Sequence, residues 1–281
     1  MLKKRLIPCL VLRNDIIVQS IGFKQYLPIG KAEIAIEFFM NWDVDEIILV
    51  DITATASGKK PNLELINHIS KKCFLPLSVG GGIQSVEDAK NVISAGADKI
   101  IINTAAIHHP ELLQSCASAL GSQAVVLSMD VKKKINGQFE IYLNSGKQGT
   151  GLDPVDFAAK ASRMGAGEIF LNSIDRDGMK NGYEIDVIKA VSDAVRIPVI
   201  ACGGVGTMQH FVDGILKGNA SAVSAANIFQ HMEQSTIVAK AFMKKKGIDV
   251  RLISKANYDD FEFDELGRVL KSPRIKKTWW Y

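Results

Sequence analysis

The stretch Leu77-Ser78-Val79-Gly80-Gly81-Gly82-Ile83 ends a short apolar run in three consecutive glycines, and a helical pattern opens at Ser85. A strand that stops at a glycine run beside a helix N-terminus leaves backbone N–H groups free to bind a phosphate. Alone, such a run is more often an ordinary tight turn. The same switch recurs at Val199-Ile200-Ala201-Cys202-Gly203-Gly204-Val205, where Gly203 lies 122 positions after Gly81.

A shift of 122 positions aligns much more of the chain than these glycines. The segment from Glu46 to His109 matches the segment from Glu168 to His231 without a gap, with glutamate, glycine and apolar positions in common. An internal repeat of this kind indicates a duplicated structural unit. We therefore predict two homologous halves, each built from four strand–helix units.

Composition sets the broad class of the protein. The chain has 281 residues, of which 47% are hydrophobic, which is enough for one large domain with a substantial core. A net charge of +4, with lysine and arginine dispersed, argues against a nucleic-acid partner. No apolar stretch approaches membrane-spanning length, so no membrane association is expected.

The four cysteines, Cys9, Cys73, Cys116 and Cys202, show no Cys-x-x-Cys spacing. This pattern indicates reduced thiols in a cytoplasmic protein rather than disulfides or a zinc site. We expect neither a metal nor an organic cofactor. The apolar run from Leu6 to Leu12 meets polar residues too soon for a signal peptide, and it is interpreted as a first strand.

Strands and helices alternate along the chain. Apolar runs predict strands near Leu6–Leu12, Ile47–Asp51, Pro76–Val79, Lys99–Ile102, Ala124–Asp130, Glu168–Asn172, Pro198–Ala201 and Ala220–Ala225. Helical patterns cover Glu33–Trp42, Asn62–Lys72, Val86–Ala95, Pro110–Leu120, Pro154–Met164 and Ile185–Val195. Short, nearly continuous apolar runs are typical of buried parallel strands. Eight of them in two like halves predict an α/β fold, the (β/α)8 TIM barrel.

Two segments extend this plain barrel. The long loop from Lys132 to Gly151 contains Asn136-Gly137 between apolar residues, which favours a hairpin on the face where barrels carry their active sites. We place the barrel at residues 1–253 and a C-terminal extension at residues 254–281. The extension ends in Trp279-Trp280-Tyr281, which favours docking onto this barrel, a second copy or a partner enzyme, with a disordered end as the alternative.

The two glycine turns are candidate phosphate cradles on opposite sides of the barrel mouth. In the first half, Gly81 and Gly82 are joined by Asn103 and Thr104 at the end of the next strand. The equivalent positions of the second half are Gly203, Gly204, Ala226 and Asn227. Two cradles related by pseudo-symmetry are suited to an elongated ligand with a phosphate at each end.

Several stretches resemble the cyclase subunit of imidazole-glycerol-phosphate synthase. They are Ile7-Pro8-Cys9-Leu10, Asp51-Ile52-Thr53-Ala54, Val79–Ile83, Ile102–Ala106, Gly121–Val126 and Ser173-Ile174-Asp175-Arg176-Asp177-Gly178. The resemblance implies a barrel that takes ammonia from a glutaminase bound at its N-terminal face. It also implies a bisphosphorylated ribotide as substrate of the cyclase, and adds Asp177 and Gly178 to the phosphate-binding positions.

The family's chemistry rests on two aspartates, at the ends of the first and fifth strands. The fifth-strand member is Asp130, but the first-strand position is Val11. Valine cannot exchange a proton, and loss of one positioned acid or base costs about 10²–10⁴ in rate. Asp15, four residues on, is expected to lie in a loop and not to replace it. Further departures from the family are Gln19, Asn172, Cys202 and Asn227.

The opposite face keeps the family's ammonia gate. Arg5, Glu46, Lys99 and Glu168 match a ring of alternating charges at the bottom of the barrel. By resemblance, Asp98 is a contact to the glutaminase. Solvated surface charge is the alternative interpretation of these residues.

An intact ammonia intake beside an altered cyclase site resembles a side branch associated with glycosyl amidation in bacterial surface-polysaccharide clusters. There the barrel relays ammonia to a sugar amidotransferase. In this chain, the C-terminal extension is a candidate contact for such an enzyme. Two alternatives stay open: a working cyclase of histidine biosynthesis, and a non-catalytic scaffold that activates a glutaminase. The sugar itself cannot be inferred from the sequence.

Overall fold

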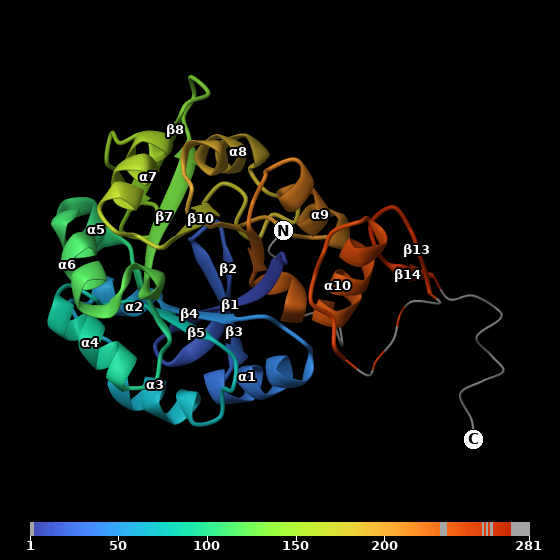
Figure 1. Ribbon diagram of the computed structural model, residues 1–281, viewed down its shortest axis with the longest axis horizontal. Coiled ribbons are helices and arrows are strands. Elements are labelled where there is room, and N and C mark those ends of the chain that lie inside the picture. The colour runs from blue at the N-terminus through green and yellow to red at the C-terminus, as the bar shows by residue number, and fades with distance from the viewer. Residues whose placement is uncertain (1–2, 231–234, 255, 257, 259–260, 271–281) are drawn as a thin grey trace.

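The computed structural model describes residues 3–230, 235–254, 256, 258 and 261–270. Eight parallel strands close into a barrel, in which β7 pairs with β10 and β12 pairs with β1 (Figure 1). The strands are β1 (Arg5–Arg13), β4 (Ile47–Asp51), β5 (Leu77–Gly80), β6 (Lys99–Ile102), β7 (Val125–Lys133), β10 (Glu168–Ser173), β11 (Val199–Cys202) and β12 (Ala222–Ala225). The predicted (β/α)8 barrel is confirmed.

Helices surround the barrel. They are α1 (Ala32–Asn41), α3 (Leu63–Ser70), α4 (Val86–Ser94), α6 (Glu111–Leu120), α7 (Pro154–Arg163), α8 (Ile185–Ala194), α9 (Met208–Leu216) and α10 (Ser235–Lys245). Two short helices, α2 (Ile52–Ala56) and α5 (Thr104–His108), begin where β4 and β6 end. Among the described residues, no helix has the length and apolar character needed to cross a membrane.

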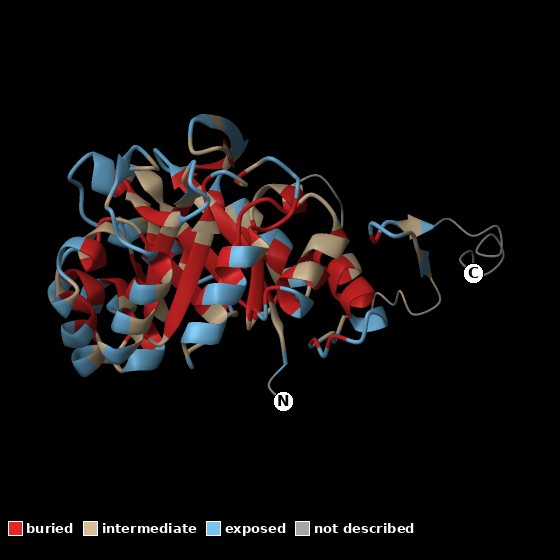
Figure 2. Ribbon diagram, turned by 90° about the horizontal axis from the view of Figure 1, so that it is seen from above, coloured by how far each residue is buried: buried red, intermediate tan, exposed pale blue. Residues whose placement is uncertain are grey.

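Two separate apolar cores hold the fold together. The larger one lies between the strands and the helices, whose outward faces are exposed (Figure 2). The smaller one fills the inside of the barrel and contains Ile7, Cys9, Ile48, Ile101, Val126, Phe170, Ile200, Cys202 and Ala222. Side chains alternate along a strand, so every barrel strand except β5 contributes to both cores in turn.

Two hairpins rise from the carboxyl ends of the strands. In the first, β1 continues through a two-residue turn into β2 (Ile16–Ile21), which pairs with β3 (Gln25–Gly30). In the second, β7 turns into β8 (Phe139–Leu143), and the turn is closed by a 2.7 Å bond from the Lys134 N–H to the Gln138 carbonyl. This second hairpin is the one predicted from Asn136-Gly137; a short strand, β9 (Gln148–Gly149), pairs with β8.

The first hairpin was not predicted from the sequence. Its turn residues, Asn14 and Asp15, have φ angles of 50° and 63°. Two successive residues with positive φ form the type I′ turn that best fits the twist of paired strands. Asn14-Asp15 between apolar residues was the signal that would have revealed it.

The described part of the C-terminal extension packs beside α9 and α10. A small hairpin, β13 (Glu262–Phe263) with β14 (Val269–Leu270), places the Phe263 ring 5.5 Å from that of Phe242. The Met208 N–H at the start of α9 donates to the Leu266 carbonyl at 3.0 Å. Trp279, Trp280 and Tyr281, for which docking was predicted, lie outside the described residues.

Candidate functional site

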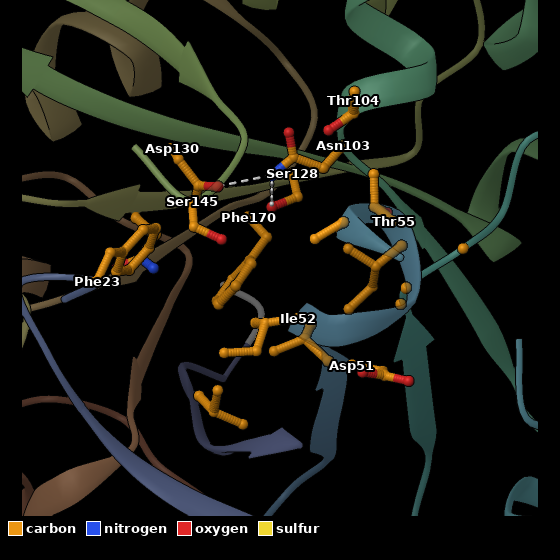
Figure 3. Close-up of a pocket in the computed structure, with 18 of the residues that line it drawn as sticks. Phe23, Asp51, Ile52, Thr55, Asn103, Thr104, Ser128, Asp130, Ser145 and Phe170 are labelled. Carbon is orange, nitrogen blue, oxygen red and sulfur yellow. Dashed lines mark hydrogen bonds between the residues drawn. The ribbon is translucent and has the colours of Figure 1, made fainter. Parts of the chain in front are cut away.

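A cavity of about 510 Å³ opens at the carboxyl ends of the barrel strands. Its walls come from both halves of the barrel, and they include the first glycine turn and the β2–β3 hairpin. Figure 3 shows Asp130, Asn103 and Ser128 together at one wall, with Phe170 and Ile52 facing the same space. The cavity therefore combines a few polar groups with an apolar floor, as ligand sites usually do.

Asp130 is the central ionisable group of this cavity. It lies on β7, and its Oδ2 accepts a 2.8 Å hydrogen bond from Asn103 Nδ2. Burial raises the pKa of Asp130 to about 7, the Asp177 charge acts in the same direction, and hydrogen bonds from Asn103 and Asn172 oppose the shift. A carboxyl group that titrates near neutral pH can both accept and return a proton.

The position at the end of β1 where a second carboxylate was expected by resemblance holds Val11. Val11 lines the cavity there and packs against the apolar core inside the barrel. Asp15 does not line the cavity; it is exposed, and its Oδ1 accepts from Asn62 Nδ2 at 3.2 Å. The site thus has one proton-exchanging group at this point, and Asp15 is held elsewhere.

Asp177 is the second buried carboxylate of the cavity. Its carboxylate accepts hydrogen bonds from the β2–β3 hairpin. Its Oδ2 accepts from Ser20 Oγ at 2.6 Å and from the Phe23 N–H at 3.2 Å. Its backbone carbonyl accepts from the Gly22 N–H at 2.9 Å. Burial raises the pKa of Asp177, while these hydrogen bonds oppose the shift. These hydrogen bonds to Asp177 therefore hold the hairpin over the mouth of the barrel.

The first glycine turn is open to the cavity. Gly81 and Gly82 have φ angles of 116° and 73°, which L side chains rarely adopt. A Cβ atom at Gly81 would lie 2.5 Å from the Asp51 carbonyl oxygen, so the turn has room only for glycine. Asn103 and Thr104, the other two residues of the predicted first cradle, also line the cavity.

The second glycine turn, Gly203-Gly204, is buried. Gly178, Gly203, Gly204 and Asn227 are not among the residues that line the cavity, although Ala226 is. A Cβ atom at Gly178 would lie 2.6 Å from the Ser20 carbonyl oxygen. Asn227 Nδ2 donates to the same carbonyl at 2.7 Å. The two halves therefore differ at the cavity. Gly81 and Gly82 line it, whereas Gly203 and Gly204 pack against the end of β10 and the loop after it, and the β2–β3 hairpin contacts Gly178 and Asn227.

At the N-terminal end of the barrel, four charged side chains form a closed ring of ion pairs. Arg5 Nη1 lies 2.8 Å from Glu46 Oε2, and Arg5 Nη2 lies 2.8 Å from Glu168 Oε1. Lys99 Nζ lies 3.0 Å from both Glu46 Oε2 and Glu168 Oε2. Glu46, whose side chain is only 2% exposed, also accepts from Ser78 Oγ at 2.6 Å. Each buried charge is therefore paired with two opposite charges.

Neighbouring contacts hold the ring in place. Asp45, next to Glu46, accepts from the Leu6 N–H at 2.8 Å and from the fully buried Lys240 Nζ at 2.9 Å. Exposed Asp98, next to Lys99, accepts from the Leu77 N–H at 2.8 Å. These contacts bind the beginnings of β1, β4, β5 and β6 to one another around the ring.

The ring and the cavity lie at opposite ends of one apolar column. On four strands, a ring residue is followed two positions later by an apolar residue of the barrel interior, and two positions after that by a residue lining the cavity. The four triplets are Arg5–Ile7–Cys9, Glu46–Ile48–Val50, Lys99–Ile101–Asn103 and Glu168–Phe170–Asn172. The period of two along a strand places all twelve side chains inside the barrel.

Cys9 and Cys202 lie where this column meets the cavity. Both thiols are free, and the hydrogen bond between them raises the pKa of Cys9, as does burial. Cys9 is therefore protonated and poorly reactive at neutral pH. Among the described residues, no group of three or more His, Cys, Asp or Glu side chains is arranged to hold a metal ion.

Some residues of the cavity were not selected from the sequence. Thr55 and His108 line its wall, and Ser20 and Phe23 close its rim. Thr55 and His108 belong to the short helices α2 and α5, which carry no strong periodic signal. Ser20 and Phe23 belong to the hairpin that the Asn14-Asp15 turn would have revealed.

We expect the free energy of unfolding to depend on pH through the titration of Asp130. The folded-state pKa of about 7 lies above the value of about 3.9 in an unfolded chain. Between these values the folded state binds the extra proton, so stability falls as pH rises toward 7 and above. The loss from about pH 5 to about pH 8 should be roughly 2–3 kcal/mol. Urea denaturation at both pH values measures it.

Asp130→Asn is the control for this measurement, because it keeps the shape of the side chain and removes the titration. Between about pH 5 and about pH 8, the free energy of unfolding of the variant should fall by roughly 2–3 kcal/mol less than that of the unmodified protein. Equal losses in the two proteins would show that Asp130 ionises at an ordinary pKa and is not the neutral-pH acid of the cavity.

Comparison with known proteins places this geometry in a family. Residues 5–236 match the family model described as histidine biosynthesis protein. A protein of Vibrio vulnificus (strain YJ016), provisionally named imidazole glycerol phosphate synthase subunit hisF2, is 49% identical over 268 residues. That match covers 95% of this chain and 98% of the relative. The chain therefore belongs to the histidine biosynthesis protein family, among its cyclase-like subunits of imidazole glycerol phosphate synthase.

Proposed function

We propose that this protein relays ammonia through its barrel, from a glutaminase at the N-terminal face to an acceptor at the cavity. The observation that carries the proposal is the column that joins the closed ring of Arg5, Glu46, Lys99 and Glu168 to the cavity around Asp130. A buried ion pair is weak evidence of a stabilising role, because the cost of removing its charges from water offsets most of their attraction. Stability alone is therefore a weak reason for four charges to meet at the entrance of an apolar column.

The chemistry of the column suits a small neutral molecule. Ions are strongly disfavoured in an apolar interior, whereas neutral ammonia carries no charge that must be desolvated. The ring excludes water while closed, and movement of the Lys99 side chain, which is 17% exposed, opens it. At the far end, Asp130 can exchange a proton with the arriving nitrogen because its pKa lies near 7.

Cyclase chemistry is the second candidate, and Val11 argues against it. The paired mechanism needs one carboxyl group to give a proton while another removes one, and only Asp130 is in place. The second glycine turn argues in the same direction, because Gly203 and Gly204 do not line the cavity and a bisphosphorylated substrate needs both cradles. We therefore favour ammonia relay to a separate enzyme, such as the sugar amidotransferase of a surface-polysaccharide pathway, over histidine biosynthesis.

The N-terminal face offers a surface for the glutaminase. Asp98 is exposed there, and Phe74, in the loop that precedes β5, is 83% exposed. An exposed phenylalanine beside a charged ring is typical of a protein–protein contact. A scaffold that only activates the glutaminase would use the same surface, but would not need the column.

We expect the purified protein not to cyclise the ribulosyl bisphosphate substrate of the family when ammonium salt is supplied. Loss of one of two acid–base groups lowers the rate by about 10²–10⁴. An ordinary cyclase subunit, assayed in parallel, is the control. Val11→Asp alone should restore little, because Gln19 and Asn227 also depart from the family. Turnover within about tenfold of the ordinary cyclase would return the protein to histidine biosynthesis.

We expect Lys99→Ala to uncouple the two sources of ammonia in the assembled system. The substitution removes one cation of the ring, so the entrance no longer closes against water. Glutamine-dependent amidation should fall, while amidation driven by excess free ammonium should survive. Lys90→Ala, which removes an exposed lysine of α4, is the matched control and should leave both activities unchanged.

Two results would contradict this proposal. Equal loss of both activities in Lys99→Ala, with normal assembly, would mean that Lys99 does not act as a gate. Failure to bind any glutaminase encoded with the protein would exclude the relay altogether.

A further inference from the structure

A second hollow, with a charge opposite to that of the cavity, lies above the barrel mouth. It has a volume of about 800 Å³, within the range of roughly 300–1,000 Å³ found for ligand sites. Its walls are the β2–β3 hairpin, the β7–β9 hairpin and the loop after β10. We call this hollow the basic groove, because its charged residues are Arg13, Lys24, Lys132, Lys147 and a single carboxylate, Asp175.

The cations of the basic groove are not neutralised by the protein. Within the described part of the chain, none of the four has a carboxylate within ion-pair distance. Arg13 lies 4.6 Å from the centre of the Tyr26 ring, and Lys132 lies 5.6 Å from that of Tyr142. The Asp175 carboxylate already accepts from the Lys133 N–H at 2.9 Å. Four like charges gathered without counterions favour a polyanionic ligand.

The four cations are brought together only by folding. Arg13 ends β1, Lys24 lies in the β2–β3 turn, Lys132 is on β7, and Lys147 lies in the turn between β8 and β9. The two hairpins that carry them are additions to the eight strand–helix units of the barrel. Neither glycine turn contributes to the groove, so it is distinct from both candidate phosphate cradles.

The basic groove also offers apolar and aromatic surface. Phe23 and Tyr26 line it, together with Ile174 and Met179. Phe23 has a φ angle of 56°, which is unusual for a bulky residue, and its N–H is held by Asp177. A ring held in a strained backbone at the edge of a charged groove favours contact with a planar group of the ligand.

The basic groove and the cavity are continuous. Phe23, Tyr26, Ile52, Ala56 and Ser145 line both of them. The lining of the cavity contains Asp51, Asp130 and Asp177, but no lysine or arginine. A ligand that spans the two would therefore place its anionic part in the groove and an uncharged part in the cavity, within reach of Asp130.

We propose that the basic groove binds the diphosphate of a nucleoside diphosphate, with the group esterified to that diphosphate entering the cavity. This assignment rests on the proposed function in one respect. If the barrel relays ammonia, the bound nucleotide derivative is the acceptor of the nitrogen, and it lies where the column opens into the cavity. The binding itself needs no glutaminase and is tested on the barrel protein alone.

The test is calorimetric titration of the complete chain with UDP, uridine and inorganic phosphate. UDP should bind, and the other two should bind at least about tenfold more weakly, because each offers only part of the contact. The double variant Lys24→Gln/Lys147→Gln should bind UDP about tenfold more weakly or worse, since two charge-assisted contacts to phosphate are lost. Added salt should weaken UDP binding to the unmodified protein.

The double variant Lys71→Gln/Lys90→Gln is the matched control. It removes the same net charge from exposed positions on the outer surface of the barrel, at the end of α3 and on α4, and should bind UDP as the unmodified protein does. Unchanged circular dichroism and melting temperature in both double variants would establish that folding is intact.

Three results would overturn the assignment: no binding of UDP, equal binding by the groove variant, or tighter binding of a glutamate-rich peptide that displaces UDP. The last would assign the groove to an acidic segment of a partner protein. These outcomes are independent of the relay. UDP binding by a barrel that recruits no glutaminase would refute the relay alone, and a working relay without UDP binding would refute the groove alone.

Discussion

The structure depends on the ring of ion pairs that closes the N-terminal end of the barrel. Glu46 is almost completely buried and accepts from Arg5, Lys99 and Ser78, so removal of either cation would leave a buried carboxylate partly unpaired. Because the ring residues stand two positions before the apolar side chains of the interior, the ring also fixes which face of four strands points inward. With that face of the strands pointing inward, the next side chains form the apolar column, and those after them line the cavity.

Much of this arrangement could be predicted from the sequence because it depends on short-range patterns and on an internal repeat. Continuous apolar runs indicated buried parallel strands, and the match of Glu46–His109 with Glu168–His231 indicated two halves. Asp130 was placed at the end of the fifth predicted strand, and family resemblance identified Val11 as the residue at the corresponding position of the first strand. Arg5, Glu46, Lys99 and Glu168 were recognised as a set through family resemblance, and their mutual distances required the structure.

What the sequence could not supply depends on contacts between distant segments. The carbonyl of Ser20 in the β2–β3 hairpin lies against Gly178 and accepts a hydrogen bond from Asn227, although both residues are far from it in sequence. The pKa of Asp130 depends on its burial and on the charge of Asp177, and neither can be predicted from a sequence motif. The basic groove joins Arg13 to Lys147 through two hairpins, of which only one had a recognised turn signal.

The most direct test of the account follows the origin of the transferred nitrogen. The barrel protein, its glutaminase and the acceptor enzyme would be supplied with amide-¹⁵N glutamine and excess unlabelled ammonium, and the isotope content of the amidated product would be measured by mass spectrometry. The account predicts mainly ¹⁵N in the product, and mainly unlabelled nitrogen when Ala222→Phe obstructs the column at a position facing the barrel interior. A product that follows the bulk ammonium in the unmodified complex would contradict passage of ammonia through the barrel.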